Sequence, residues 1–202
     1  YGSNYIAKRL LDLSCLVLFS VIYIPIGIIT LIYILLRNGG PPIIKQTRVG
    51  LHGKNFKMYK FRTMKKDSHE ERVDLEKLNT HSGPLFKIEN DPRIFKGGSF
   101  LRKYSIDEIP QLINVLLGEM SVVGPRPLFP EDNAHYNEHY IRRLNVMPGI
   151  TGLLQINERN TDDFKIWYKY DLEYIENWNI FLDIKIILLT PFSLFKSKIT
   201  GV

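Results

Sequence analysis

The feature that most constrains the fold is the uncharged apolar run of residues 13–36, "LSCLVLFSVIYIPIGIITLIYILL". Its 24 residues exceed the roughly 20 that a helix needs to cross a bilayer, and the roughly 7–15 apolar residues of a signal peptide. Pro25 stands at the midpoint, where it removes a backbone donor and crowds the carbonyl of Val21, which predicts a kink. Ser20, one turn earlier, can hydrogen-bond back to the helix and ease the break.

The charges beside this run are compatible with two membrane topologies. Lys8 and Arg9 precede it, and Arg37, Lys45 and Arg48 follow it. A crossing helix usually has basic residues mainly on its cytoplasmic side. A re-entrant hairpin, which has both ends at one face, would instead show basic residues on both sides. On pattern alone, the spanning helix and the hairpin stay equally open.

Composition restricts the class of partner. The chain of 202 residues is long enough for one domain with a real core, and its net charge of +6 favours anionic partners such as phosphorylated substrates or lipid headgroups. The chain has a single cysteine, Cys15 in the apolar run, so an internal disulfide framework is excluded. The chain begins with Tyr1 and not Met, which leaves open a longer native protein.

After Pro42 the sequence becomes mixed and predicts an α/β fold that is mostly helical. Residues 43–50 and 55–64 read as two strands joined by a turn at 51–54. Residues 67–82 are polar, and we expect a solvent-exposed segment or short exposed helix with no catalytic role. A loop that leads into a strand or helix at 146–160 could contact a base or a sugar through Thr151, Gln155 and Arg159, although this signal is nonspecific.

Two adjacent carboxylates, Asp107 and Glu108, open the segment "SIDEIPQLINVLLGEMSVVGPRP" at residues 105–127. Ser105 and Glu108 match a capping box, whereas Asp107 as the cap would leave Pro110 harmlessly in the first turn. Either choice places both carboxylates at the positive end of a helix. Ordinary capping therefore explains the pair, which alone is weak evidence for catalysis. The helix is predicted to carry its apolar residues on one face, at helical spacing: Ile109, Leu112, Ile113, Leu116, Leu117 and Met120.

Four cations are expected around this helix start: Lys60, Arg62, Arg102 and Arg126. Pro125 and Pro127 fix the backbone on each side of Arg126, and a guanidinium on a stiff mount suits bidentate phosphate binding. Two carboxylates among such cations suggest a divalent metal with phosphate ligands. Mg²⁺ fits, because it takes few carboxylates together with substrate oxygens.

Two further clusters of residues give weaker evidence of function. His135 and His139, with Glu131 and Glu138 near, lack the order and the third ligand of a zinc site, so a solvated helical face is the better interpretation. The aromatic residues of 167–178 fit an interfacial belt or ordinary core packing equally well. Residues 180–195 could lie along a membrane surface.

Four motifs in order carry a family resemblance: "KMYKFRTM", "SIDEIPQLINVLLGEMSVVGPRP", "PGITGLLQINERN" and "LDIKI". Together they resemble the bacterial sugar transferase family, the monotopic phosphoglycosyl transferases. The resemblance extends from the apolar run to about Leu189.

The resemblance implies transfer of a phospho-sugar from a UDP-sugar to a polyprenol phosphate, with release of UMP. It implies a ping-pong reaction in which Asp107 is the nucleophile and carries a covalent phospho-sugar. Glu108, with Asp107 beside it, would hold Mg²⁺, and Lys60, Arg102 and Arg126 would bind phosphate.

The resemblance also implies a re-entrant membrane helix, broken near Pro25, with Lys8 and Arg9 as the basic pair before it. Residues 1–38 would form this membrane element. Residues 39–202 would form a compact catalytic domain with a small sheet and surface amphipathic helices, at the cytoplasmic face of the bacterial inner membrane. Ile24 departs from the serine that the family often has before the proline, so the break would rely on Ser20 or on water.

Two other classes of function remain as alternatives. A direct-displacement transferase or a metal-dependent phosphohydrolase would use Asp107 as a general base and would form no covalent adduct. A non-catalytic basic tether would bind anionic lipid without chemistry. We expect membrane lipids and no nucleic acid among the partners, and a homodimer stays open. No residue identifies the sugar.

Overall fold

The computed structural model describes residues 4–65, 91–131, 140–159, 161 and 163–196. It is a helix-rich mixed fold with two small sheets, as the sequence predicts. The predictions for residues 67–82 and for His135, Glu138 and His139 concern positions outside the described residues.

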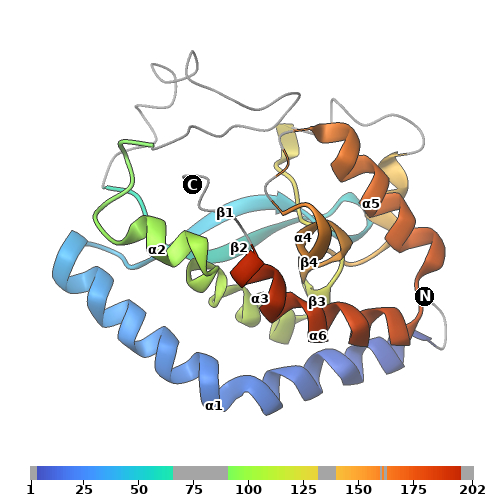
Figure 1. The fold of residues 1–202 in the computed structure, drawn as a ribbon, viewed down its shortest axis with the longest axis horizontal. Coiled ribbons are helices and arrows are strands. Elements are labelled where there is room, and N and C mark those ends of the chain that lie inside the picture. The colour runs from blue at the N-terminus through green and yellow to red at the C-terminus, as the bar shows by residue number, and fades with distance from the viewer. Residues whose placement is uncertain (1–3, 66–90, 132–139, 160, 162, 197–202) are drawn as a thin grey trace.

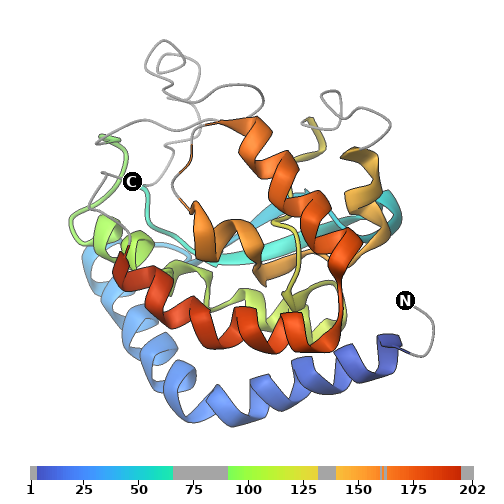
Figure 2. The same ribbon diagram turned by 45° about the vertical axis from the view of Figure 1, so that its right-hand side comes forward.

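The N-terminal helix α1 (Asn4–Asn38) contains Pro25 and runs along one side of the molecule (Figure 1). Both ribbon views show it changing direction near its middle, so the predicted kink is confirmed (Figures 1 and 2). The Ser20 hydroxyl donates to the carbonyl of Val17 at 2.7 Å, so it bonds back to the helix as predicted. Within the described chain, α1 is the one helix that is long and apolar enough to cross a membrane, and only 17% of its apolar window is buried.

An antiparallel hairpin of β1 (Ile43–Val49) and β2 (Asn55–Phe61) follows α1. Ile43 pairs with Phe61 and Val49 with Asn55, around the short turn η1 (Leu51–Gly53). The predicted strand pair and its turn are thus confirmed. Lys60 is the second-last residue of β2.

The second sheet is a parallel pair, β3 (Ser121–Val123) and β4 (Gly149–Thr151). Glycine is required at this crossing, since a Cβ on Gly124 would lie 2.9 Å from the amide nitrogen of Gly149. Three helices complete the fold: α4 (Leu153–Asn157), α5 (Phe164–Asn177) and α6 (Ile180–Lys196). The predicted buried strand before Pro125 and the loop leading to a strand and helix are confirmed.

The start of the central helix differs from the prediction. Asp107 and Glu108 lie in a separate 3₁₀ turn, η4 (Ile106–Glu108), and Pro110 is the N-cap of α3 (Gln111–Leu117). Neither Ser105 nor Asp107 makes a side-chain cap. A proline at the cap explains the boundary, because its missing N–H is not needed there.

The predicted apolar face of the central helix is buried only in part. Met120, which follows α3, is buried, and Ile109 and Leu112 pack against the hydrophobic clusters. Gln111, Asn114 and Val115 are buried, whereas Leu116 is 62% exposed, and Ile113 and Leu117 are exposed as well. Figure 1 shows α1, α3 and α6 gathered along one side of the molecule. Exposed apolar residues also occur on α6: Phe181, Leu188 and Phe192. Exposed apolar side chains on helices that lie along one side of the molecule suit contact with lipid.

Hydrophobic clusters join α1 to the body on both sides of Pro25. Leu16 packs with Met58, Val115 and Met120. Beyond the bend, Ile34 packs in a second cluster with three further side chains from the body: Phe61, Phe95 and Leu101. Both arms of the bent helix are therefore fixed to the same body.

Candidate active site

The two carboxylates are presented by a constrained turn. Ser105, which precedes η4, has a left-handed φ of 52°, a conformation uncommon outside glycine. Arg159 holds this turn by donating to the Ser105 hydroxyl at 2.6 Å and to the carbonyl of Arg102 at 3.2 Å. Arg159 thus stabilises the backbone of the site, and its pKa is lowered, mainly by burial.

Glu108 is held by two cations at one oxygen. Lys60 Nζ lies 3.0 Å from Glu108 Oε1, and a guanidinium nitrogen of Arg126 lies 2.6 Å from the same atom. Burial alone would raise the pKa of Glu108, but Arg126 and Lys60 outweigh it, so the pKa is lowered. Glu108 is therefore an anion at neutral pH.

Asp107 differs from its neighbour. Its side chain is buried, and no donor in the described part of the chain hydrogen-bonds to its carboxylate. Burial raises the pKa of Asp107 to about 6, against the opposing charge of Lys60. Arg102 also acts on it, while its Nε donates to the Thr63 hydroxyl at 2.8 Å. Asp107 is thus a carboxylate available for chemistry among cations that do not bond to it.

The backbone of Arg126 is fixed by a buried relay that the sequence did not reveal. A guanidinium nitrogen of Arg143 donates to the carbonyl of Arg126 at 2.5 Å, and Arg143 Nε pairs with Asp171 at 3.0 Å. The hydroxyl of Tyr140 donates to the same carboxylate at 2.9 Å. These residues are far apart in sequence and belong to no recognisable spacing. This relay of Arg143, Asp171 and Tyr140 therefore restrains the backbone of Arg126 together with the flanking prolines.

Asn114 is a second residue that sequence reasoning missed. Its amide oxygen accepts from the backbone N–H of Tyr59 at 3.0 Å, and its nitrogen donates to the carbonyl of Lys57 at 2.8 Å. These bonds lock α3 to β2 next to Lys60. Its place three residues after Gln111, on the same helical face, was the available signal.

Three predicted site residues lie apart from this carboxylate–cation cluster, defined as Lys60, Arg102, Asp107, Glu108 and Arg126. Arg62 bonds to the carbonyls of Asn38 and Gly39, where it closes the end of α1. Thr151 shares a hydrogen bond of 2.8 Å with Thr190 of α6. Gln155 lies beside Gly152, with its amide nitrogen buried and without a partner in the described chain.

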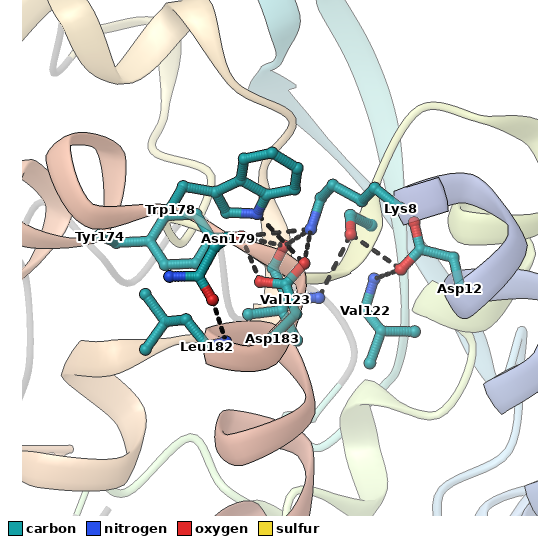
Figure 3. Close-up of polar contacts among 10 residues, drawn as sticks. Lys8, Asp12, Val122, Val123, Tyr174, Trp178, Asn179, Leu182 and Asp183 are labelled. Carbon is teal, nitrogen blue, oxygen red and sulfur yellow. Dashed lines mark hydrogen bonds and ion pairs between the residues drawn. The ribbon is translucent and has the colours of Figure 1, made fainter. Parts of the chain in front are cut away.

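The basic pair before the apolar run bonds to the protein interior. Lys8 is buried and donates to Asp183 at 2.7 Å, to the carbonyl of Val123 at 2.9 Å and to the hydroxyl of Tyr174 at 3.1 Å (Figure 3). Arg9 donates to the carbonyls of Val115 and Leu116, at 2.5 and 2.8 Å, and so closes the C-terminal end of α3.

The anchor of Lys8 continues through the neighbouring strand. Asp12 accepts from the hydroxyl of Ser121 and from the backbone N–H of Val122, both at 2.8 Å (Figure 3). The indole of Trp178 donates to Asp183 at 3.2 Å. Lys8 and Asp12 thus attach α1 to β3 and α6, and β3 leads directly to Arg126.

Comparison with known proteins assigns this arrangement to a family. The sequence profile described as bacterial sugar transferase matches residues 3–197. The chain belongs to the bacterial sugar transferase family. The resemblance drawn from the motifs is therefore confirmed.

Three relatives are between 40% and 47% identical to this chain. The galactosyl transferase CpsE of Streptococcus agalactiae is 47% identical over 93% of this chain and 42% of its own length. The UDP-glucose:undecaprenyl-phosphate glucose-1-phosphate transferase of Escherichia coli is 40% identical over 98% of this chain and 42% of its own length. The sugar transferase EpsL of Bacillus subtilis is 42% identical, over 92% of this chain and 85% of its own length. The chain thus spans about two fifths of the length of some relatives.

The Mg²⁺ that the family resemblance implies fits the two carboxylates only with help from substrate. The described chain has no group of three or more His, Cys, Asp or Glu residues that could hold a metal. Glu108 Oε1 is taken by Lys60 and Arg126, which leaves Oε2 and the carboxylate of Asp107. Mg²⁺ is commonly held by one or two carboxylates plus substrate phosphates and water, and this donor set is compatible with that arrangement.

Proposed function

We propose that this protein transfers a phospho-sugar from a UDP-sugar to a polyprenol phosphate such as undecaprenyl phosphate, through a covalent intermediate on Asp107. The observation that carries the proposal is the contrast within one turn: Glu108 is bonded to two cations, whereas Asp107 is buried among cations and accepts no hydrogen bond from the described residues. The names of relatives as undecaprenyl-phosphate phosphotransferases support the general reaction.

In the first half-reaction, an oxygen of Asp107 attacks the phosphorus that carries the sugar. The bond from this phosphorus to the bridging oxygen of the diphosphate breaks, and UMP leaves with that oxygen and its electron pair. Asp107 is then joined to the phospho-sugar by an acyl phosphate bond. Its pKa of about 6 means that it is ionised at neutral pH and ready to attack.

In the second half-reaction, a phosphate oxygen of the polyprenol phosphate attacks the same phosphorus. The acyl phosphate bond breaks, the carboxylate of Asp107 is regenerated, and a polyprenol diphosphate sugar forms. Asp107 thus splits one difficult substitution into two, and the second substrate need not be present for the first step.

The cations around Asp107 stabilise charge on the transferring group. Arg126 stands on a stiff mount, and its side chain remains about one third exposed, so part of the guanidinium is open to a phosphate. Lys60 and Arg102 bring two more charges from β2 and α2 (Gly98–Lys103). Glu108 and Asp107 would hold Mg²⁺, which when bound neutralises phosphate charge.

A re-entrant placement of α1 in the cytoplasmic face of the inner membrane fits both substrates. The bend near Pro25 and the exposed apolar face of α1, α3 and α6 support it. Residues 1–38 would then lie in the bilayer and residues 39–202 on its surface. A soluble nucleotide sugar and a lipid phosphate can both reach a site held at that level, which makes a full crossing unnecessary.

Intact-protein mass spectrometry tests the covalent step directly. The full chain in detergent, with Mg²⁺ and either UDP-galactose or UDP-glucose but no polyprenol phosphate, should gain the mass of one phospho-sugar and release UMP. Asp107→Asn should show neither change. Arg142→Ala, at an exposed ion pair with Glu176, is the control that should behave as wild type.

The alternatives give different results in the same experiment. UMP release that requires undecaprenyl phosphate, without any adduct, would remove Asp107 as nucleophile and indicate direct displacement. Phosphate or sugar phosphate released to water would indicate a hydrolase. Vesicle binding that survives Asp107→Asn, with no turnover of any UDP-sugar, would favour the tether.

A further inference from the structure

Gln111 shares a surface with the two carboxylates. The backbone stays helical from η4 into α3, since Ile109 and Pro110 both have right-handed helical φ and ψ. Gln111 follows Asp107 by four residues and Glu108 by three, the spacings at which side chains meet on a helix. Its Cα–Cβ bond also tilts toward the N-terminal end, which is the end that carries the carboxylates.

The side chain of Gln111 is buried but incompletely bonded. It is 2% exposed, and its amide nitrogen has no hydrogen-bond partner in the described chain. Asn114, one turn later, uses both ends of its amide on β2 and Glu119. The fold therefore satisfies one buried amide and leaves the other with free donors, a state that destabilises the folded protein. A group that completes the bonds of Gln111 would have to come from outside the described residues.

The chemistry of the site indicates what that group is. An attack by Asp107 requires the phosphorus to approach within about 3–3.5 Å of its carboxylate oxygen. The non-bridging oxygens of that phosphoryl group then lie over the same helical face, one turn from Gln111. An amide donates to such an oxygen without adding a cation beside Asp107.

We propose that the Gln111 amide donates a hydrogen bond to a non-bridging oxygen of the phosphoryl group that Asp107 attacks. Gln111 would then be a catalytic residue beside the cations of the carboxylate–cation cluster. The inference rests on the proposed function, because it needs the phosphoryl group to be delivered to Asp107.

Gln111→Met tests the contact, because Met conserves length and volume while removing both donors. We expect kcat for UMP release to fall about 10²-fold, with little change in KM for the UDP-sugar. The midpoint of thermal unfolding should stay equal to that of wild type or rise, since an unpaired buried amide is removed. Leu112→Met, a neighbouring change on the same helix, is the matched control and should keep activity.

Three results would overturn the contact. The first is an active wild type with Gln111→Met within twofold of it. The second is a loss of activity explained by an equally lowered unfolding midpoint, which would indicate packing. The third is a shift of the acid limb of the pH–rate profile, which would mean that Gln111 acts on Asp107. A wild type that releases no UMP from UDP-galactose or UDP-glucose, with or without undecaprenyl phosphate, would instead overturn the proposed function together with this contact.

Discussion

Two buried lysine–carboxylate pairs in this molecule have opposite characters. At the anchor, defined as Lys8, Asp183 and the groups bonded to them, the lysine uses all three N–H donors on protein acceptors. At the carboxylate–cation cluster, Lys60 bonds to Glu108, while Asp107 accepts no hydrogen bond from the described chain. A saturated polar network holds elements together, whereas an unsaturated one keeps groups for a ligand. The two sites are distinguished by how completely their hydrogen bonds are satisfied, and not by net charge or burial alone.

The largest effect on stability is expected from a substitution at the anchor. Lys8→Met leaves Asp183 buried without its cation, which should destabilise the protein by about 3–5 kcal/mol. At about 2–4 °C per kcal/mol for a chain of this size, the midpoint of thermal unfolding in detergent should fall by about 6–20 °C. Arg142→Ala, at a pair whose side chains are 43% and 52% exposed, should change stability by about 0–1 kcal/mol. Equal midpoints for the two variants would contradict a saturated anchor.

The same kind of change at the cluster should affect rate more than stability. Arg126→Ala leaves Lys60 on Glu108, so the unfolding midpoint should fall less than in Lys8→Met. UMP release should fall about 10²–10³-fold, as for loss of one preorganised donor to developing charge. Arg126→Lys keeps the charge but loses the planar fork, and we expect an intermediate rate. A loss of rate that only tracks the loss of folded protein would make Arg126 structural.

A third prediction uses pH to sharpen the contrast between Asp107 and Glu108. Because burial raises the pKa of Asp107 to about 6, its nucleophilic form disappears as pH falls through that value. Adduct formation should therefore drop about tenfold per pH unit below 6 and level off above it. Quenched-flow mass spectrometry at pH 4.5–8 gives the profile. A flat profile down to pH 5 would contradict this assignment.

The same raised pKa has a consequence for stability. A buried acid whose folded pKa lies above its unfolded value of about 3.9 destabilises the fold increasingly as pH rises from about 4 to 6. Asp107→Asn should therefore unfold at a temperature no lower than wild type at pH 8, although it is inactive. A lower midpoint would mean that the cations need the charge of Asp107 for folding.

The smallest effect is expected at the relay behind Arg126. Tyr140→Phe removes one hydrogen bond to Asp171, which should destabilise the protein by about 1 kcal/mol and lower the unfolding midpoint by about 2–4 °C. UMP release should remain within about threefold of wild type, since Arg143 still holds Arg126. Tyr168→Phe, whose hydroxyl has no hydrogen bond in the described chain, is the control. A large loss of rate would show that the relay is less rigid than its bonds suggest.

The sequence predicted the elements whose patterns depend on local chemistry. Alternation gave the β1–β2 hairpin, Pro25 gave the bend, and the "SVVGPRP" string gave a buried strand before a stiff loop. Lys60, Arg102 and Arg126 meet the carboxylates as expected. The motif resemblance was needed to assign the reaction class.

Other features depend on tertiary contacts that no periodicity reveals. The apolar residues predicted on one helical face divide in the structure, because Met120 is buried whereas Ile113, Leu116 and Leu117 are exposed. The buried side of α3 also carries Gln111 and Asn114, and the Asn114 amide bonds to β2. Arg62 was grouped with the phosphate-binding cations by charge, and Lys8 was predicted as part of the basic pair of a membrane hairpin, whereas both side chains bond within the fold itself.

The contact between Gly27 and Ile109 has a mechanical consequence. A Cβ at Gly27, two residues beyond Pro25, would lie 3.6 Å from a methyl carbon of Ile109, the residue that directly follows Glu108. Arg9 grips the far end of α3 from the other arm of the same helix. A displacement of α1 relative to the body would therefore act on both ends of the segment that carries Asp107. In the proposed re-entrant placement, the depth of α1 in the lipid would thereby act on the height of Asp107 above the membrane.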